Sequence, residues 1–98
     1  MIYLTQLIYI KAGCEDIFDA FEAKAIPLIA RYGGQLLLRF RPGTVIEANM
    51  PVPYEVHFIC FPSTAHFESF RHDGERLSFL HLKDQSVQES ILVSGVRL

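Results

Sequence analysis

Three side chains on two predicted strands have types that could carry out acid–base chemistry together. Arg39 lies in residues 35–41, whereas Glu55 and His57 lie in residues 54–61. Alternate residues of a strand face the same side, so Glu55 and His57 share a face, and Arg39 joins them if the two strands pair. His57 could act as a general base, because histidine side chains ordinarily titrate close to neutral pH. Arg39 could hold an anionic or enolate-like oxygen, and Glu55 could orient the histidine.

The same three residues also permit a purely structural interpretation. A buried Arg39–Glu55 ion pair and a hydrogen-bonded His57 would fix the register of a dimer without any reaction. Structural ion pairs and catalytic groups use the same residue types, so the sequence leaves both interpretations open.

Three further polar residues are candidates for ligand binding. Arg41 follows Arg39 by two positions and lies either at the mouth of a cavity or at a solvated edge. In the first predicted strand the direction of the side chains is ambiguous, because both alternate sets are apolar. Either Gln6 or Tyr9 therefore lines the cavity, and the sequence does not decide between them.

The elements that must position these residues follow from hydrophobic periodicity and turn signals. Four stretches have the composition or the alternation of strands, namely residues 2–10, 35–41, 54–61 and 91–97. Helical spacing runs from about residue 15 to Tyr32 and ends at Gly33-Gly34, and Pro62-Ser63 begins a second helix. The order β-α-β-β-α-β predicts an α+β protein of the ferredoxin-like arrangement, with both helices on one face of an antiparallel sheet.

Both faces of this predicted sheet are apolar, which predicts a partner. We expect the helices to cover one set of side chains, namely Leu36, Leu38, Phe40, Val56, Phe58 and Cys60. The opposite face carries Leu37, Ile59 and Phe61 and is too apolar to be left in water. A homodimer in which the two open faces meet would cover it. The cavity between sheet and partner would then contain Arg39 and His57.

Composition limits the function classes. The 98 residues are expected to form one domain, residues 1–98, and a formal net charge of −2 argues against a nucleic-acid partner. Cys14 and Cys60 are too few for a disulfide framework and indicate a reducing, cytoplasmic setting. Residues 2–10 are interrupted by Thr5 and Gln6, so we expect neither a signal peptide nor a membrane span.

No metal or cofactor is expected from the spacing of potential ligands. His57 and Cys60 are three residues apart on a strand and therefore face opposite sides. His66 and His72 are six residues apart, which does not place them on a common helix face.

Two segments resemble the DUF1330 family. The segment Pro27-Leu28-Ile29-Ala30-Arg31-Tyr32-Gly33-Gly34, followed by an arginine-bearing strand, is similar to one signature of that family, and Phe61-Pro62-Ser63 with Phe67 and Phe70 is similar to the second. The resemblance implies a dimeric α+β barrel, the class that includes cofactor-free monooxygenases and isomerases. It carries over no catalytic residue, and the chain departs from the family after the second helix, at Asp73-Gly74-Glu75-Arg76.

Two functions remain open at this stage. The first is a cofactor-independent enzyme, isomerase or monooxygenase-like, that acts on a small organic compound with His57, Arg39 and Glu55. The second is a homodimeric module that binds a small ligand or serves a structural role without turnover. Whether the chain is an enzyme is not determined by its sequence.

Overall fold

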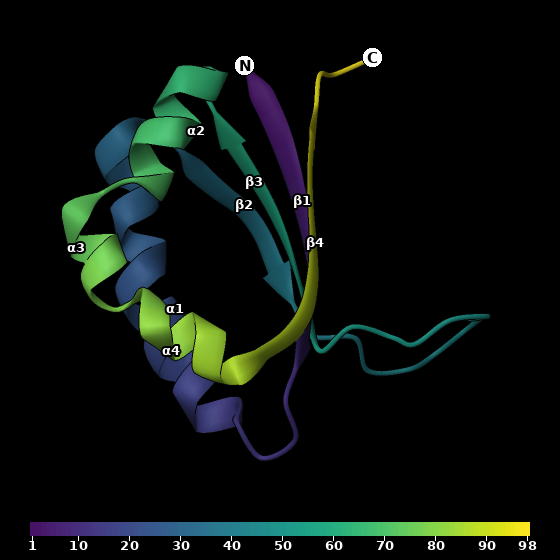
Figure 1. Cartoon of the computed structure of the whole chain (residues 1–98). Helices are drawn as coiled ribbons and strands as arrows, with labels where there is room; N and C mark the ends of the chain where they lie inside the picture. Colours follow the sequence, from purple (N-terminus) through teal and green to yellow (C-terminus); the bar gives the residue numbers. More distant parts are fainter.

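The computed structural model describes all 98 residues, and its helices lie on one face of a single sheet (Figure 1). The elements in chain order are β1 (Ile2–Ile10), α1 (Glu15–Ile29), a 3₁₀ turn (Ala30–Tyr32), β2 (Gln35–Phe40), β3 (Glu55–Phe61), α2 (Thr64–Arg71), α3 (Gly74–Ser78), α4 (Leu80–Ser86) and β4 (Val87–Gly95).

The sheet has the strand order β2-β3-β1-β4, and every neighbouring pair is antiparallel. The order 4-1-3-2 with helical connections on one face is the ferredoxin-like arrangement, so the fold class predicted from the sequence is confirmed. No helix combines the length and the apolar composition that crossing a bilayer requires.

Glycine determines where the first helix ends and the second strand begins. Gly33 has φ +74°, a left-handed conformation that side chains with a β-carbon rarely adopt, and it ends the 3₁₀ turn as the sequence predicts. The backbone of Gly34 packs directly against Phe61, since a β-carbon there would lie 2.5 Å from Phe61 Cε1. The turn between Tyr32 and β2 is therefore tightly packed against β3.

The second helix begins as predicted, whereas the first tolerates its proline. Ser63 Oγ accepts a hydrogen bond from the backbone N–H of His66 at 3.2 Å, which caps α2. Pro27 lies within α1, which continues for two residues beyond it before tightening into the 3₁₀ turn. The helix is not interrupted before the proline.

The hydrophobic core lies between α1 and the inner face of the sheet. It consists of side chains from both layers and from the helices after β3, namely Leu4, Phe21, Ala25, Leu28, Ile29, Ile59, Phe61, Phe70 and Phe79. Its four phenylalanines come from α1, β3, α2 and the residue between α3 and α4, so the core joins α1, the sheet and the helices after β3.

The predicted assignment of β3 to the two faces of the sheet is wrong. Ile59 and Phe61, expected on the open face, are buried under the helices, and Glu55 and His57 lie on that same side. Phe58, expected under the helices, is 37 % exposed on the open face. The alternation is correct but shifted by one residue, which in a strand exchanges the two faces.

A bulge in β2 explains why the leucines of its two halves lie on opposite faces of the sheet. Leu36 pairs with Ile59 and packs on the core, but Leu38 pairs with Phe58, so the register shifts between them. Leu38 and Phe40 are consequently exposed on the open face, at 50 % and 42 %. Arg39 pairs with His57 and stays on the helix side. A bulge of this kind is invisible to strict alternation.

Two boundaries also differ from the sequence prediction. The last strand begins at Val87 and not at residue 91, because α4 ends at Ser86 and the chain enters β4 without a loop. The strand predicted over residues 35–41 ends at Phe40, and the irregular segment 41–54 that follows extends from the sheet on the side away from the helices (Figure 1).

The open face of the sheet and the segment 41–54 expose many large apolar side chains. On the sheet these are Leu38, Phe40, Phe58, Ile91 and Val93, and in the segment they are Val45, Ile46, Met50 and Val52. The single chain has 6226 Å² of accessible surface, whereas a compact monomer of this mass is expected to have roughly 5,700 Å². The chain alone therefore leaves an unusually large apolar surface uncovered.

Candidate functional site

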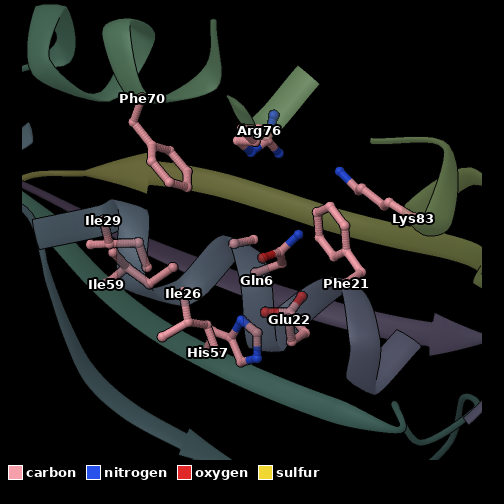
Figure 2. A pocket seen from close by; sticks show the side chains of 11 residues that line it. Gln6, Phe21, Glu22, Ile26, Ile29, His57, Ile59, Phe70, Arg76 and Lys83 are labelled. Carbon is pink, nitrogen blue, oxygen red and sulfur yellow. The ribbon is translucent and has the colours of Figure 1, made fainter. Parts of the chain in front are cut away.

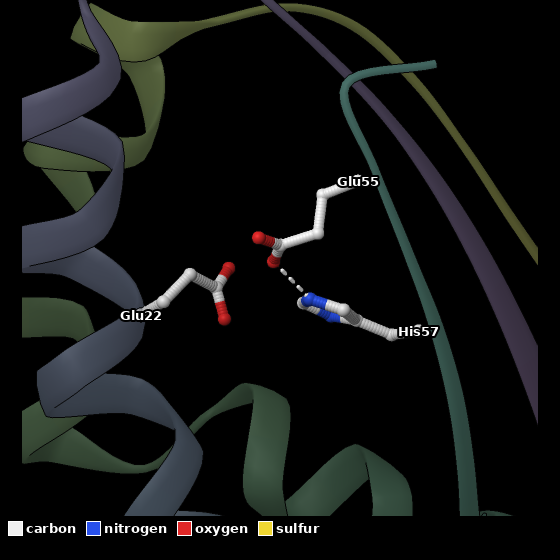
Figure 3. A group of neighbouring side chains, drawn as sticks. All are labelled: Glu22, Glu55 and His57. Carbon is white, nitrogen blue, oxygen red and sulfur yellow. Dashed lines mark hydrogen bonds and ion pairs between the residues drawn. The ribbon is translucent and has the colours of Figure 1, made fainter. Parts of the chain in front are cut away.

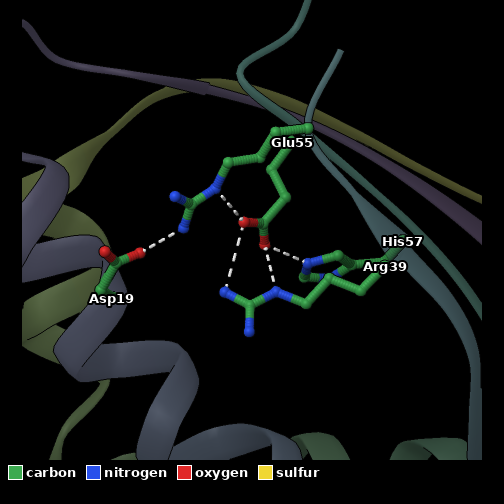
Figure 4. A network of polar contacts seen from close by, with 5 residues as sticks. Asp19, Arg39, Glu55 and His57 are labelled. Carbon is green, nitrogen blue, oxygen red and sulfur yellow. Dashed lines mark hydrogen bonds and ion pairs between the residues drawn. The ribbon is translucent and has the colours of Figure 1, made fainter. Parts of the chain in front are cut away.

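A buried carboxylate, Glu55, is the centre of the polar network beneath α1. Arg39 Nε donates to Glu55 Oε2 at 2.9 Å and Arg39 Nη2 to Oε1 at 3.2 Å. Arg41 Nε donates to the same Oε1 at 3.0 Å, and Arg41 Nη2 donates to Asp19 on α1 at 2.7 Å. His57 Nε2 also bonds Glu55 Oε2 (Figure 4). The network thus joins β2, β3 and α1.

The charge of Glu55 determines the tautomer of His57. Burial by itself raises the pKa of Glu55, but hydrogen bonds from His57, Arg39 and Arg41 outweigh it and lower the pKa to about 2. An ionised carboxylate can only accept, so His57 Nε2–H is the donor of their hydrogen bond. The other ring nitrogen, Nδ1, makes no hydrogen bond with the chain. It therefore carries the lone pair that could accept a proton.

A second carboxyl group, Glu22, faces this pair from α1 (Figure 3). Glu22 is 6 % exposed and makes no hydrogen bond or ion pair. One oxygen of its carboxylate nevertheless lies within 4.8 Å of a carboxylate oxygen of Glu55 and of a ring nitrogen of His57. Burial raises the pKa of Glu22, and the negative charge of Glu55 adds to that effect. One carboxyl group of the cluster is thus held ionised, while the other is pushed toward its protonated form.

Two connected hollows open beside this cluster, between the sheet and the helices. The inner chamber is lined by His57, Glu22 and Gln6 together with apolar side chains of α1, and its volume is about 50 Å³. The outer chamber has about 200 Å³ and is lined by residues of β1, β3, α2, α3, α4 and β4. Five residues line both chambers: Gln6, Ile59, Phe70, Arg76 and Lys83. Figure 2 shows Arg76 and Lys83 on one side of the space, and Glu22 of α1 and His57 of β3 on the other.

The structure brings together some of the residues predicted from the sequence and separates others. Arg39, Glu55 and His57 do form one cluster, but it lies under the chain's own helices and not in a cavity shared with a partner. Arg39 lines neither chamber, because its guanidinium is engaged by Glu55. Its expected role as an oxyanion holder stays a prediction, which neither chamber supports.

The remaining three candidates have different positions. Gln6 pairs with His57 across β1 and β3 and lines both chambers, which resolves the ambiguity of the first strand. Tyr9 lies on the opposite face, where its hydroxyl donates to the carbonyl of Pro51 at 2.8 Å. Arg41 lies at the sheet edge and bonds Glu55 and Asp19, so it is neither free in solvent nor in a chamber.

Three residues that line the chambers were not identified from the sequence. Glu22 interrupts the apolar stripe of α1 formed by Phe18 and Ala25, and a charged residue in a buried stripe was the available signal. Arg76 and Lys83 gave no signal, since they lie in short helices whose docking onto the sheet depends on tertiary packing.

Glu22, Glu55 and His57 also have the geometry of a possible metal site. Their donor atoms lie within 4.8 Å of one another, and all three residues are buried. A cation would, however, have to compete with Arg39 and Arg41 for the Glu55 carboxylate, and two guanidinium groups disfavour a further positive charge. The residues present do not fit a metal ion well, and its absence stays a prediction.

Comparison with known proteins places the chain in a structural class. No protein-family model and no curated protein matches this sequence. Solved structures do match over nearly the whole chain. A protein of unknown function from Rhodopseudomonas palustris has a TM-score of 0.84 at 17 % identity, with 99 % of this chain and 82 % of that one covered.

Two further matches carry more descriptive titles. One is a DABB family protein with a ferredoxin-like fold from Mesorhizobium loti (TM-score 0.71, 15 % identity, covering 99 % of this chain and 96 % of that one). The other is a dimeric protein of unknown function and ferredoxin-like fold from Bacteroides fragilis (TM-score 0.72, 8 % identity, covering 96 % and 93 %). At these identities the likeness establishes the ferredoxin-like fold alone. The resemblance to the DUF1330 family stays a prediction.

Proposed function

We propose that this chain is an enzyme that moves a proton on a small organic carbonyl compound, with His57 as the base. The observation that carries the proposal is a buried histidine beside a cavity and between two buried carboxyl groups, one with a lowered pKa and the other with a raised pKa. Pairs of titratable groups whose surroundings push their pKa values apart are typical of general acid–base sites.

The chemistry follows from the positions of the protons. His57 Nδ1 accepts a proton from the carbon next to the substrate carbonyl, while Glu55 accepts the Nε2–H hydrogen bond and stabilises the imidazolium that forms. Glu22, held toward its protonated form, donates its proton to the developing enolate oxygen. In a β,γ-unsaturated carbonyl substrate, return of the proton from His57 to the γ-carbon of the dienol, and of the enol proton to Glu22, moves the double bond and completes an isomerisation without oxidant or reductant.

Arg39 and Arg41 act as positioning residues in this proposal. They hold Glu55 ionised, and Glu55 in turn holds His57 in the reactive tautomer. A cofactor-independent oxidation would begin with the same proton removal and would need dioxygen as a co-reactant. We therefore take isomerisation as the simpler proposal.

The alternative function, ligand binding without turnover, is favoured by one observation. Glu55 is fully engaged by Arg39, Arg41 and His57, which is also what a purely structural ion pair requires. The two functions differ in whether Nδ1 of His57 exchanges protons with a bound compound.

A deuterium-exchange assay separates them. Small ketones and 2-oxo acids are incubated with the protein in D₂O, and loss of their α-proton signals is followed by ¹H NMR. We expect exchange with at least one compound and a loss of about 10²- to 10⁴-fold in His57→Gln. His66→Gln is the control, because His66 is exposed on α2 outside both chambers. No exchange with any compound between pH 6 and 8, or equal exchange in His57→Gln, would contradict the proposal.

We also propose that two copies associate through the open face of the sheet. The exposed apolar residues of that face and of segment 41–54 support this arrangement, and one structural neighbour is described as dimeric. Both chambers are bounded by residues of a single chain, so the reaction would not depend on the partner.

A further inference from the structure

Two cations, Arg76 and Lys83, border both chambers without a carboxylate partner. Neither takes part in an ion pair of the chain, and Lys83 makes no side-chain hydrogen bond. Arg76 Nη1 donates to the carbonyl of Arg71 at 3.1 Å, but its Nε is buried with no acceptor. Arg76 Nε is the only buried side-chain nitrogen or oxygen that is left unsatisfied. Such a donor requires an explanation, and an absent anionic ligand provides one.

The other charged groups that face this space do not neutralise the pair. Arg71 lines the outer chamber but is paired with Glu68 at 3.3 Å. Asp84 also lines it and is exposed. Glu22, in the inner chamber, is the group whose protonated form is favoured by burial. Positive charge therefore dominates the wall formed by α3 and α4.

Burial makes these two positive charges unfavourable in the empty chain. It lowers the pKa of Arg76, and the nearby Arg71 adds to that effect. It likewise lowers the pKa of Lys83, with Arg76 as the next cause. Two like charges at a partly buried site repel each other, and a bound anion would remove this unfavourable interaction.

The rest of the outer chamber is apolar and small. Phe70 lies beneath the Arg76 guanidinium, whose carbon is 5.2 Å from the ring centroid, and Ile59, Leu80 and Leu92 form other parts of the wall. A volume of about 200 Å³ is below the roughly 300–1,000 Å³ of pockets for drug-sized ligands. A compact ligand with an apolar body and one charged group fits these properties better than a fully charged ion does.

We propose that Arg76 and Lys83 bind the carboxylate of a small organic acid in the outer chamber, so that its carbon framework extends toward His57 and Glu22. Arg76 presents planar donors suited to a carboxylate, and Lys83 adds a second charge. The proposal names the substrate class of the site described above and rests on the proposed function in taking that site as the place of reaction. A phosphate group would satisfy the same donors, so the test includes it.

Binding is measured by isothermal titration calorimetry with benzoate, its neutral counterpart benzamide, and inorganic phosphate. We expect benzoate to bind at least about 10-fold more tightly than benzamide and more tightly than phosphate. Arg76→Gln and Lys83→Gln should each weaken benzoate binding by about 10-fold or more, because each removes a charge-assisted hydrogen bond. Lys24→Gln is the matched control, since Lys24 is an exposed cation on α1 outside both chambers, with its Nζ 5.9 Å from the ring centroid of Phe79.

The outcomes separate this inference from the proposed function. Equal binding of benzoate and benzamide, no binding of benzoate, or benzoate binding that is unchanged in both cation variants would overturn it. Tighter binding of phosphate would overturn the assignment to a carboxylate. The same titration with His57→Gln should give benzoate affinity within about 3-fold of wild type. Benzoate binding that needs Arg76 and Lys83, in a protein that exchanges no protons, would uphold the inference and refute the enzyme.

Discussion

Protonation of Glu55 should lower the free energy of unfolding at low pH, and Glu55→Gln should remove this pH dependence. The pKa of Glu55 falls from an ordinary value of 4.5 to about 2 in the folded chain. Because the folded value is the lower one, Glu55 stabilises the fold above about pH 4.5, and this contribution is lost as the pH falls toward 2. A shift of about 2.5 pKa units corresponds to about 3 kcal/mol, of which about 2 kcal/mol is lost by pH 3.

The substitution Glu55→Gln tests this reasoning directly. At pH 7 the variant should be less stable than wild type by about 3–5 kcal/mol, because Arg39 and Arg41 lose the negative charge that they share and one of its two acceptor oxygens. The difference between the two proteins should then shrink by about 2 kcal/mol between pH 7 and pH 3, since only wild type has Glu55 to protonate. The free energy of unfolding is measured by urea titration at fixed protein concentration across this range.

A matched control excludes a general effect of removing a carboxylate. Glu75 pairs with Arg31 at 2.9 Å, but both side chains are at least half exposed, so Glu75→Gln should change stability by no more than about 1 kcal/mol. If the gap between wild type and Glu55→Gln stayed constant from pH 7 to pH 3, the two arginines and His57 would not be holding the charge of Glu55, and the argument for the tautomer of His57 would fail.

Further predictions concern the two layers of the fold. Phe58→Lys, on the open face, should convert a dimer to a monomer in sedimentation velocity, whereas Leu77→Lys, which is also exposed but lies on α3, should not; an unchanged dimer in Phe58→Lys would place the interface elsewhere. Gly34→Ala should destabilise the chain by about 1–3 kcal/mol in urea unfolding, because the new β-carbon meets Phe61, whereas Gly74→Ala, with open space around it, should be neutral. Burial raises the pKa of Glu22, so the contribution of Glu22 to the free energy of unfolding is favourable below pH 4.5 and is lost as the pH rises. Glu22→Gln should therefore gain stability relative to wild type between pH 4.5 and 8, and it should lose proton exchange. Parallel curves of unfolding free energy against pH for the two proteins would refute this.

Local chemistry in the sequence determined the order of the strands and main helices and several of their ends. Gly33 stops a helix because of its positive φ, and Ser63 starts one by capping it, and both signals act over a few residues. The order of strands and helices then leaves few antiparallel topologies, and the ferredoxin-like one is observed. The grouping of Arg39, Glu55 and His57 also followed from strand periodicity, which is a local property.

Only the tertiary structure decided which face of the sheet the helices cover. Both faces of β3 are apolar enough to be buried, so hydrophobicity did not distinguish them, and the charged residues suggested the wrong one. Glu55 can be buried under α1 because Arg39, Arg41 and His57 satisfy it, and this compensation arises from two strands together. The bulge in β2 is likewise a property of strand pairing.

The positions of Arg76 and Lys83 beside the two chambers also depend on the tertiary structure. Nothing in the sequence distinguishes Arg76 and Lys83 from surface residues, and they border a cavity only because α3 and α4 pack against α1. The sequence by itself determined the fold class and the grouping of Arg39, Glu55 and His57, but not the addition of Glu22 to that cluster. Which side of the sheet holds that cluster, and which charges face it, depended on contacts between segments far apart in the chain, because burial and charge compensation are properties of the packed whole.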